Sequence, residues 1–244
     1  MEPIRIVPLR DEPLAQAPSR PAANMTYRGG PLLTAVDVVT VYIGAAWRQE
    51  PLDTLARDLD RFFDAVVTSE LFDQLGEYSV STFTIGHGSR GGSVRLELVD
   101  LGATVEDDDL RTTLRQAISA ETLPQPSPNT LYTLFLPPGV AVELQGARSC
   151  RTFCGYHDAI DERVFYAVLP YPDCGGCRAG RTPLEALTVT ASHELAEAIT
   201  DPVPGTGWYD DEVGEIGDIC AWRTKTLDEY VVQLEWSNAA GGCV

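Results

Sequence analysis

Apolar positions along the chain follow two patterns, the short continuous runs of buried strands and the three-to-four-residue repeat of amphipathic helices. Leucine, phenylalanine and valine recur at helical spacing after Pro51, which predicts a helix over residues 51–68. A second helix is predicted over residues 107–120, where acidic residues occupy the first turn. Runs rich in β-branched and aromatic residues predict strands at residues 36–43, 79–85, 94–99, 131–136 and 164–171.

The most sharply bounded element is a helix predicted over residues about 182–200. Thr182, Pro183 and Glu185 supply an N-cap, a proline at the first helical position and a capping-box acid, and Pro202 ends the helix. One apolar stripe runs along it, and His193 and Glu197 fall roughly opposite that stripe. We expect the stripe to pack on an α/β sheet and the other, polar face to carry His193 and Glu197.

The chain divides into a short arm and one larger domain. Residues 1–28 are rich in proline and predict a flexible arm. Residues 29–244 contain all the predicted helices and strands, and 44% of the 244 residues are hydrophobic, which is enough for a substantial core. We therefore expect a single α/β domain with a cysteine-rich C-terminal part.

The net charge excludes some classes of partner. The chain has 36 acidic and 18 basic residues, a formal net charge of −18, so a nucleic-acid backbone or an anionic membrane is not an expected partner. It has no apolar run of about 18 residues, so no membrane span is expected. Residues 1–24 lack the apolar core of a signal peptide.

All six cysteines lie in the last hundred residues, at Cys150, Cys154, Cys174, Cys177, Cys220 and Cys243. An even, clustered set predicts disulfides and an extracytoplasmic or exported protein, although no signal peptide is present in this chain. Whether the bridges are short or crossed stays open. The alternative is a structural zinc site formed by the first four cysteines, which the spacing favours less.

The motif with the clearest chemistry is His193-Glu194-Leu195-Ala196-Glu197, which reads H-E-x-x-E. It differs by one residue from the H-E-x-x-H helix of zinc metallopeptidases. His193 and Glu197 are four residues apart, so they project from one helix face and can chelate one metal ion. Glu194 stands where the general base of such enzymes stands.

A catalytic zinc site has three protein ligands, so a third is needed. Glu215, 18 residues after Glu197, is the first candidate, and Asp218 could support His193 by a hydrogen bond. Asp218, Asp201 and His157 are alternative ligands. Tyr209 could donate a hydrogen bond to an oxyanion near the metal. Because Glu197 replaces a neutral imidazole, we expect either weaker activity or preference for a harder cation.

The chain resembles the EXORDIUM / phosphate-induced protein family at several ordered segments. These are Gly29-Gly30-Pro31, Cys154-Gly155-Tyr156-His157, Cys174-Gly175-Gly176-Cys177, Ser192–Ala198 and Glu215–Cys220. The resemblance spans roughly residues 29–244 and is dense only from Cys150 onward. It implies an extracellular protein with paired cysteines and a zincin-like mixed sheet with the helix at about 182–200. It does not imply an established peptidase activity.

Three functions are consistent with these patterns. The leading hypothesis is a zinc-dependent metallopeptidase or related amide hydrolase, in which the strand at 164–171 forms a sheet edge that pairs with an extended peptide or protein substrate. The second is a non-catalytic secreted binding or signalling protein on a zincin-like scaffold. The third is a delivered effector or cargo protein that docks through the proline-rich arm. The oligomeric state and the identity of the metal stay open.

Overall fold

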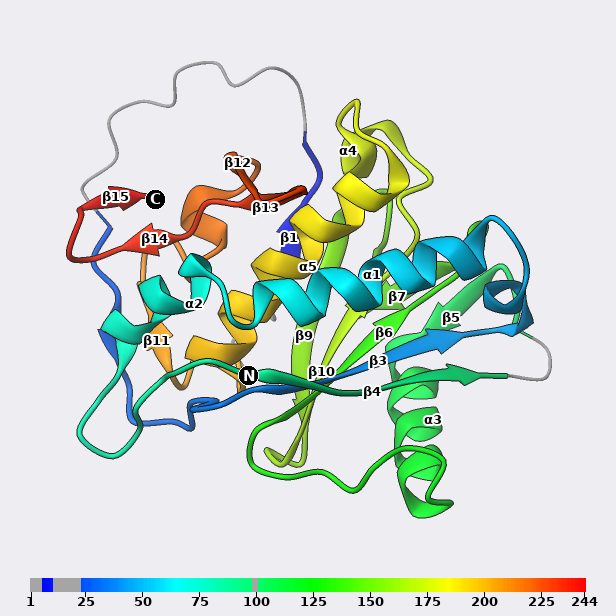
Figure 1. The fold of residues 1–244 in the computed structure, drawn as a ribbon, viewed down its shortest axis with the longest axis horizontal. Helices are drawn as coiled ribbons and strands as arrows, with labels where there is room; N and C mark the ends of the chain where they lie inside the picture. The colour runs from blue at the N-terminus through cyan, green and yellow to red at the C-terminus, as the bar shows by residue number, and fades with distance from the viewer. Residues whose placement is uncertain (1–5, 11–22, 98–100) are drawn as a thin grey trace.

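The computed structural model describes residues 6–10, 23–97 and 101–244, and these form a mixed α/β fold (Figure 1). In the described part of the chain, the central sheet has six strands in the order β1-β9-β10-β6-β3-β4. β10, β6, β3 and β4 run parallel, whereas β9 is antiparallel to both β1 and β10. The strands are β1 (Ile6–Pro8), β3 (Asp37–Ile43), β4 (Ser89–Leu96), β6 (Thr130–Phe135), β9 (Phe153–Ile160) and β10 (Val164–Leu169).

Helices cover both faces of this sheet. Helices α1 (Leu52–Val66) and α5 (Pro183–Thr200) lie on one face, and α3 (Asp107–Ser119) lies on the other (Figure 1). Two short helices, α2 (Glu70–Leu75) and α4 (Gly175–Arg178), complete the five α-helices of the described residues. Apolar side chains fill the two interfaces between these layers. The predicted α/β class is therefore confirmed at the level of a mixed α/β fold.

Four small sheets surround the central one. They are β2 (Thr26–Tyr27) with β11 (Trp208–Tyr209), β12 (Thr224–Leu227) with β13 (Tyr230–Gln233), β14 (Trp236–Ser237) with β15 (Gly242–Cys243), and β5 (Thr104–Glu106) with β7 (Ala141–Leu144) and β8 (Ala147–Arg148). β13 packs against α5. Helix α5 is therefore enclosed between the central sheet and the C-terminal segments.

The same enclosure buries the polar face of α5. Every residue from Ala186 to Thr200 is buried, so the side of the helix that carries His193 and Glu197 does not face solvent. The predicted start of the helix is confirmed, because Thr182 caps it and forms the reciprocal capping box with Glu185. The residues of the first turn determine where the helix begins, whereas residues distant from it in sequence cover its polar face.

The strand predictions were partly wrong. Residues 79–85 contain only an isolated bridge between Val80 and Phe83. The strand predicted at 94–99 is β4, which begins at Ser89 and ends at Leu96, and residues 98–99 lie outside the described residues. β10 is not a sheet edge, since it lies between β9 and β6. Two strands of the central sheet, β1 and β9, were not predicted; β9 separates β10 from the edge strand β1.

All six cysteines are described, and they form three disulfides. Cys150 pairs with Cys174 and Cys154 with Cys177, so these two bridges are crossed and tie the start of β9 to α4. Cys220 pairs with Cys243. The alternative of a four-cysteine zinc site is wrong for this structure, because no cysteine is free. Three disulfides fit an extracytoplasmic protein.

Two parts of the predicted N-terminal arm pair with the domain. Ile6–Pro8 is β1, at one edge of the central sheet, and Thr26–Tyr27 pairs with β11. Residues 1–5 and 11–22 of the predicted arm lie outside the described residues.

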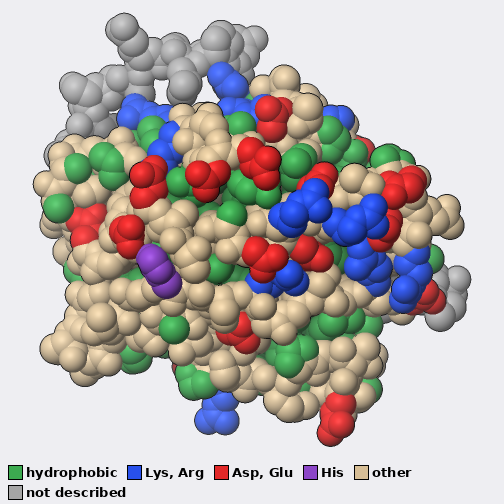
Figure 2. Space-filling model, viewed as in Figure 1, with side chains coloured by type: hydrophobic (Ala, Val, Ile, Leu, Met, Phe, Trp, Pro, Cys, Tyr) green, Lys and Arg blue, Asp and Glu red, His purple; other side chains and the backbone are tan. Residues whose placement is uncertain are grey.

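Among the described helices, none is long and apolar enough to cross a membrane. Figure 2 shows acidic and basic side chains interspersed on one face of the molecule.

Candidate metal centre

Helix α5 places the three residues of its motif together inside the molecule. His193, Glu194 and Glu197 are each 0% exposed. His193 Nε2 lies 3.0 Å from Glu197 Oε1, one helical turn away, as the i, i+4 spacing predicts. Gly155 allows β9 to approach this helix, because a Cβ at that position would lie 2.6 Å from Thr190 Cγ2.

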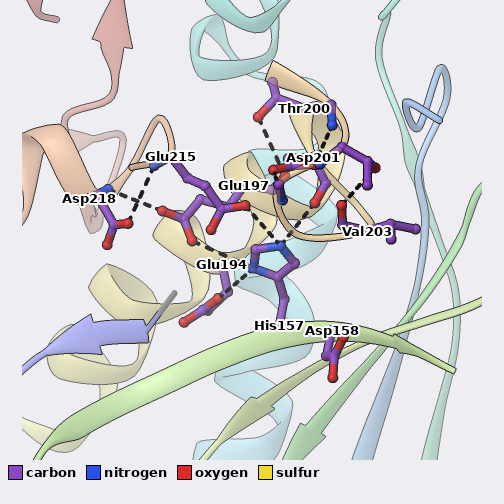
Figure 3. A network of polar contacts seen from close by, with 12 residues as sticks. His157, Asp158, Glu194, Glu197, Thr200, Asp201, Val203, Glu215 and Asp218 are labelled. Atoms are coloured by element: carbon purple, nitrogen blue, oxygen red, sulfur yellow. Dashed lines mark hydrogen bonds and ion pairs between the residues drawn. The ribbon is translucent and has the colours of Figure 1, made fainter. Parts of the chain in front are cut away.

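His157 reaches the same cluster from β9. Its Nδ1 donates a hydrogen bond to Glu194 Oε2 at 3.2 Å, and its Nε2 donates to the backbone oxygen of Asp201 at 3.1 Å. Both partners are acceptors, so the ring carries both protons and a positive charge. Burial opposes this charge, but the carboxylates of Glu215, Glu194 and Glu197 raise the pKa of His157 well above its ordinary value. Figure 3 shows this ring directed at the α5 carboxylates.

The loop after β11 supplies the third side of the cluster. Glu215 Oε1 lies 3.6 Å from His157 Nε2, and the backbone N–H of Asp218 donates to Glu197 Oε1 at 3.1 Å (Figure 3). Gly217 permits this approach, since a Cβ there would lie 2.8 Å from the His193 ring. Burial, and after it the charge of Glu197, raise the pKa of Glu215 well above its ordinary value.

Asp201 has a different role from the other carboxylates. Its oxygens accept backbone hydrogen bonds from Gly205 at 2.6 Å, Thr206 at 3.0 Å and Gly207 at 2.5 Å. These three donors fold the loop after α5 back over the helix end. The contact between Asp201 and His157 runs through the backbone oxygen. The Asp201 carboxylate is therefore engaged by the loop that covers the cluster.

Two buried residues of the cluster were missed from sequence. Gln233 Nε2 donates to His193 Nδ1 at 2.8 Å and to the backbone oxygen of Gly217 at 3.0 Å, so it orients the imidazole. Glu235 is also 0% exposed, and burial raises its pKa well above the ordinary value. The available signal was their position in Val231-Val232-Gln233-Leu234-Glu235-Trp236, two polar residues inside an otherwise apolar run.

The donor atoms fit a metal ion in number and spacing. Two sets of three residues each bring ligand atoms within 4.8 Å of one another, and both contain Glu197. One set adds His157 and Glu215, and the other adds His193 and Asp218. The two sets divide the predicted ligands, because Glu197 is in both, His193 in one and Glu215 in the other. Each set is completed by a predicted alternative ligand, Asp218 beside His193 and His157 beside Glu215.

Several of these atoms lack hydrogen-bond partners among the described residues. They include His193 Nε2, Glu194 Oε1, Glu197 Oε2 and both carboxylate oxygens of Glu215. A buried polar atom without a partner is costly, and a buried anion is more so. A divalent cation would satisfy these atoms and neutralise the carboxylates. The residues present therefore fit a bound metal.

Tyr209 lies in the β2–β11 ribbon and belongs to neither set. The Arg28 guanidinium stands over its ring, 4.3 Å from the centroid. Its predicted role as an oxyanion donor gains no support from this placement and stays a prediction.

The cluster itself is assembled from β9, α5, the loop at 214–220 and β13, segments far apart in the sequence. No protein-family model matches this chain, and no curated protein matches it.

Proposed function

We propose that this chain is a metal-dependent hydrolase of the zincin-like type, with Zn²⁺ as the first candidate metal and a peptide or related amide as substrate. The observation that carries the proposal is the buried cluster around Glu197, in which carboxylate and imidazole atoms converge and several of them lack hydrogen-bond partners in the described structure. The capped H-E-x-x-E helix supports the same proposal.

The side chains divide the chemical roles between them. Glu197, with His193 and Asp218 or with His157 and Glu215, would hold the metal, which supplies Lewis-acid polarisation of a substrate carbonyl. Glu194 is in neither set, and its Oε1 has no hydrogen-bond partner among the described residues. Burial raises the pKa of Glu194, as suits a group that accepts a proton and later releases it to a leaving amine. His157 orients Glu194 through its Nδ1.

A substrate must reach Glu194, which is 0% exposed. The loop from Pro202 to Gly207 follows α5 directly and is held by the Asp201 carboxylate. Gly205 and Thr206 of this loop also line a surface cavity of about 1020 Å³. We propose that displacement of this loop joins that cavity to the cluster and admits the substrate.

The test is metal analysis followed by assay of two variants. Protein purified without chelators should carry stoichiometric metal, and His193→Ala should lose most of it. Glu194→Gln should keep the metal and lose cleavage of a peptide mixture followed by mass spectrometry. Glu212→Gln, which changes an exposed glutamate, is the matched control and should retain both properties. Native protein that neither carries nor binds a divalent metal would refute the proposal.

A second candidate is a binding or signalling protein that keeps the metal without turnover. The complete burial of His193, Glu194, Glu197 and Glu215 favours it, because a structural site needs no route for a substrate. In that case Glu194→Gln would bind metal normally and leave the biological effect intact. The same variant therefore separates the two functions.

A further inference from the structure

The two oxygens of the Glu197 carboxylate face different groups. Oε1 lies 3.0 Å from His193 Nε2 and accepts the backbone hydrogen bond of Asp218. Oε2 lies 3.5 Å from His157 Nδ1 and has no hydrogen-bond partner in the described part of the chain. Glu197 thus stands between two groups of potential ligands and presents one oxygen to each.

Each group has the composition of a cation site. His193 and Asp218 lie on one side of Glu197, and His157 and Glu215 lie on the other, so each side offers one imidazole and one further carboxylate. Within each set the ligand atoms lie within 4.8 Å of one another. Ligands about 2.0–2.2 Å from one ion have a comparable spread.

Atoms that have ion-pair neighbours but no hydrogen-bond partner among the described residues lie on both sides. His193 Nε2 belongs to one set, and both oxygens of Glu215 belong to the other. Burial is complete on both sides, since His193, Glu197 and Glu215 are each 0% exposed. One ion would leave the atoms of the opposite set unsatisfied.

The charge of the cluster leads to the same conclusion. The carboxyl groups of Glu194, Glu197, Glu215 and Asp218 lie around only two imidazoles, those of His157 and His193. The formal charge of four carboxylates equals that of two divalent ions, whereas one ion would balance half of it.

We propose that the cluster is a dinuclear metal site in which the Glu197 carboxylate bridges two divalent ions. His193 and Asp218 would hold one ion, and His157 and Glu215 the other. Carboxylate-bridged pairs lie about 3.5–4 Å apart in two-metal hydrolases, where they clamp both oxygens of the reaction. One imidazole with carboxylates suits Zn²⁺, Mn²⁺ or Fe²⁺. This inference rests on the metal binding proposed above and goes beyond it in number and geometry.

Stoichiometry and spin coupling test the proposal together. Full-length protein stripped with chelator is titrated with Mn²⁺, and bound metal is measured by calorimetry and elemental analysis. We expect two equivalents, with an electron paramagnetic resonance spectrum of exchange-coupled Mn²⁺ at saturation. One equivalent would overturn the dinuclear site and leave the proposed function standing, whereas zero would refute both. Two equivalents without coupling would overturn the Glu197 bridge.

Variants assign each ion to its side. Asp218→Asn and Glu215→Gln should each reduce binding from two equivalents to one and remove the coupling. Asp218 is only partly buried, so its variant is expected to fold. Asp107→Asn is the matched control, since it changes a buried carboxylate outside both sets and on the far side of the central sheet, and it should retain two coupled equivalents. Two coupled equivalents in both Asp218→Asn and Glu215→Gln would contradict the assignment.

Discussion

His157 Nδ1 donates a hydrogen bond to Glu194 Oε2 at 3.2 Å, although 37 residues separate the two in sequence. The pair joins the strand β9 to the helix α5 at the centre of the cluster. Both side chains are buried, at 1% and 0% exposure, so each depends on the other for its charge. Its disruption should therefore affect stability as well as function.

Replacing His157 with Gln in metal-free protein should destabilise the fold by about 3–5 kcal/mol, because it leaves buried carboxylates without their counter-charge. The double variant His157→Gln/Glu194→Gln should recover part of that loss. Urea denaturation of both single variants and the double variant gives the coupling free energy. Strict additivity of the two single effects would contradict a direct interaction.

Gln233 should control metal affinity through His193. Gln233→Leu removes the hydrogen bond to Nδ1, and loss of such a partner typically weakens metal binding about 10–100-fold. Gln233→Glu should strengthen binding, because a carboxylate accepts the Nδ1 proton of a ring ligated through Nε2. Calorimetric titration measures both. Gln116→Leu, at an exposed position on α3, is the control and should leave affinity unchanged.

The disulfides should differ in their effect on metal binding. Cys220–Cys243 lies directly after the loop that carries Glu215 and Asp218, whereas Cys150–Cys174 precedes β9. Their loops are similar, 23 and 24 residues, so chain entropy predicts a similar loss of stability of about 3 kcal/mol for each. We expect Cys220→Ala/Cys243→Ala to weaken metal affinity more than Cys150→Ala/Cys174→Ala does. Equal affinities in the two double variants would refute this assignment.

The buried Glu235 should make stability depend on pH. Its folded-state pKa is raised well above the ordinary 4.5, chiefly by burial. Below pH 4.5 both states hold the proton, and above it the unfolded state releases the proton while the folded state keeps it. Stability therefore falls as pH rises toward the folded-state pKa. Glu235→Gln should lack this component, so its thermal midpoint relative to wild type should rise with pH. A pH-independent difference would contradict the prediction.

Local signals predicted the elements that carry the motif. The helix predicted at about 182–200 is α5, because an N-cap, a proline and a capping-box acid act within one turn. The strand predicted at 131–136 is β6, shifted by one residue. His193, Glu194, Glu197, Glu215, Asp218, Asp201 and His157 all lie in or beside the cluster.

The arrangement around the motif required long-range contacts that no local pattern encodes. The apolar stripe predicted which residues share the polar face with His193, but not that residues 214–235 fold over this face and bury it. The strand β9 was missed, and with it the true neighbour of β10. Gln233 was missed because its role comes from the packing of β13 on α5, which brings together residues 40 positions apart.

The burial of α5 on every side has a kinetic consequence. A cation held at Glu197 would have no path to solvent except through opening of the loops that cover the helix. Exchange would then be limited by protein motion and not by ligand affinity. A chelator would remove the metal at a rate independent of chelator concentration, and refolding in the presence of the metal would load the site far faster than adding it to folded protein.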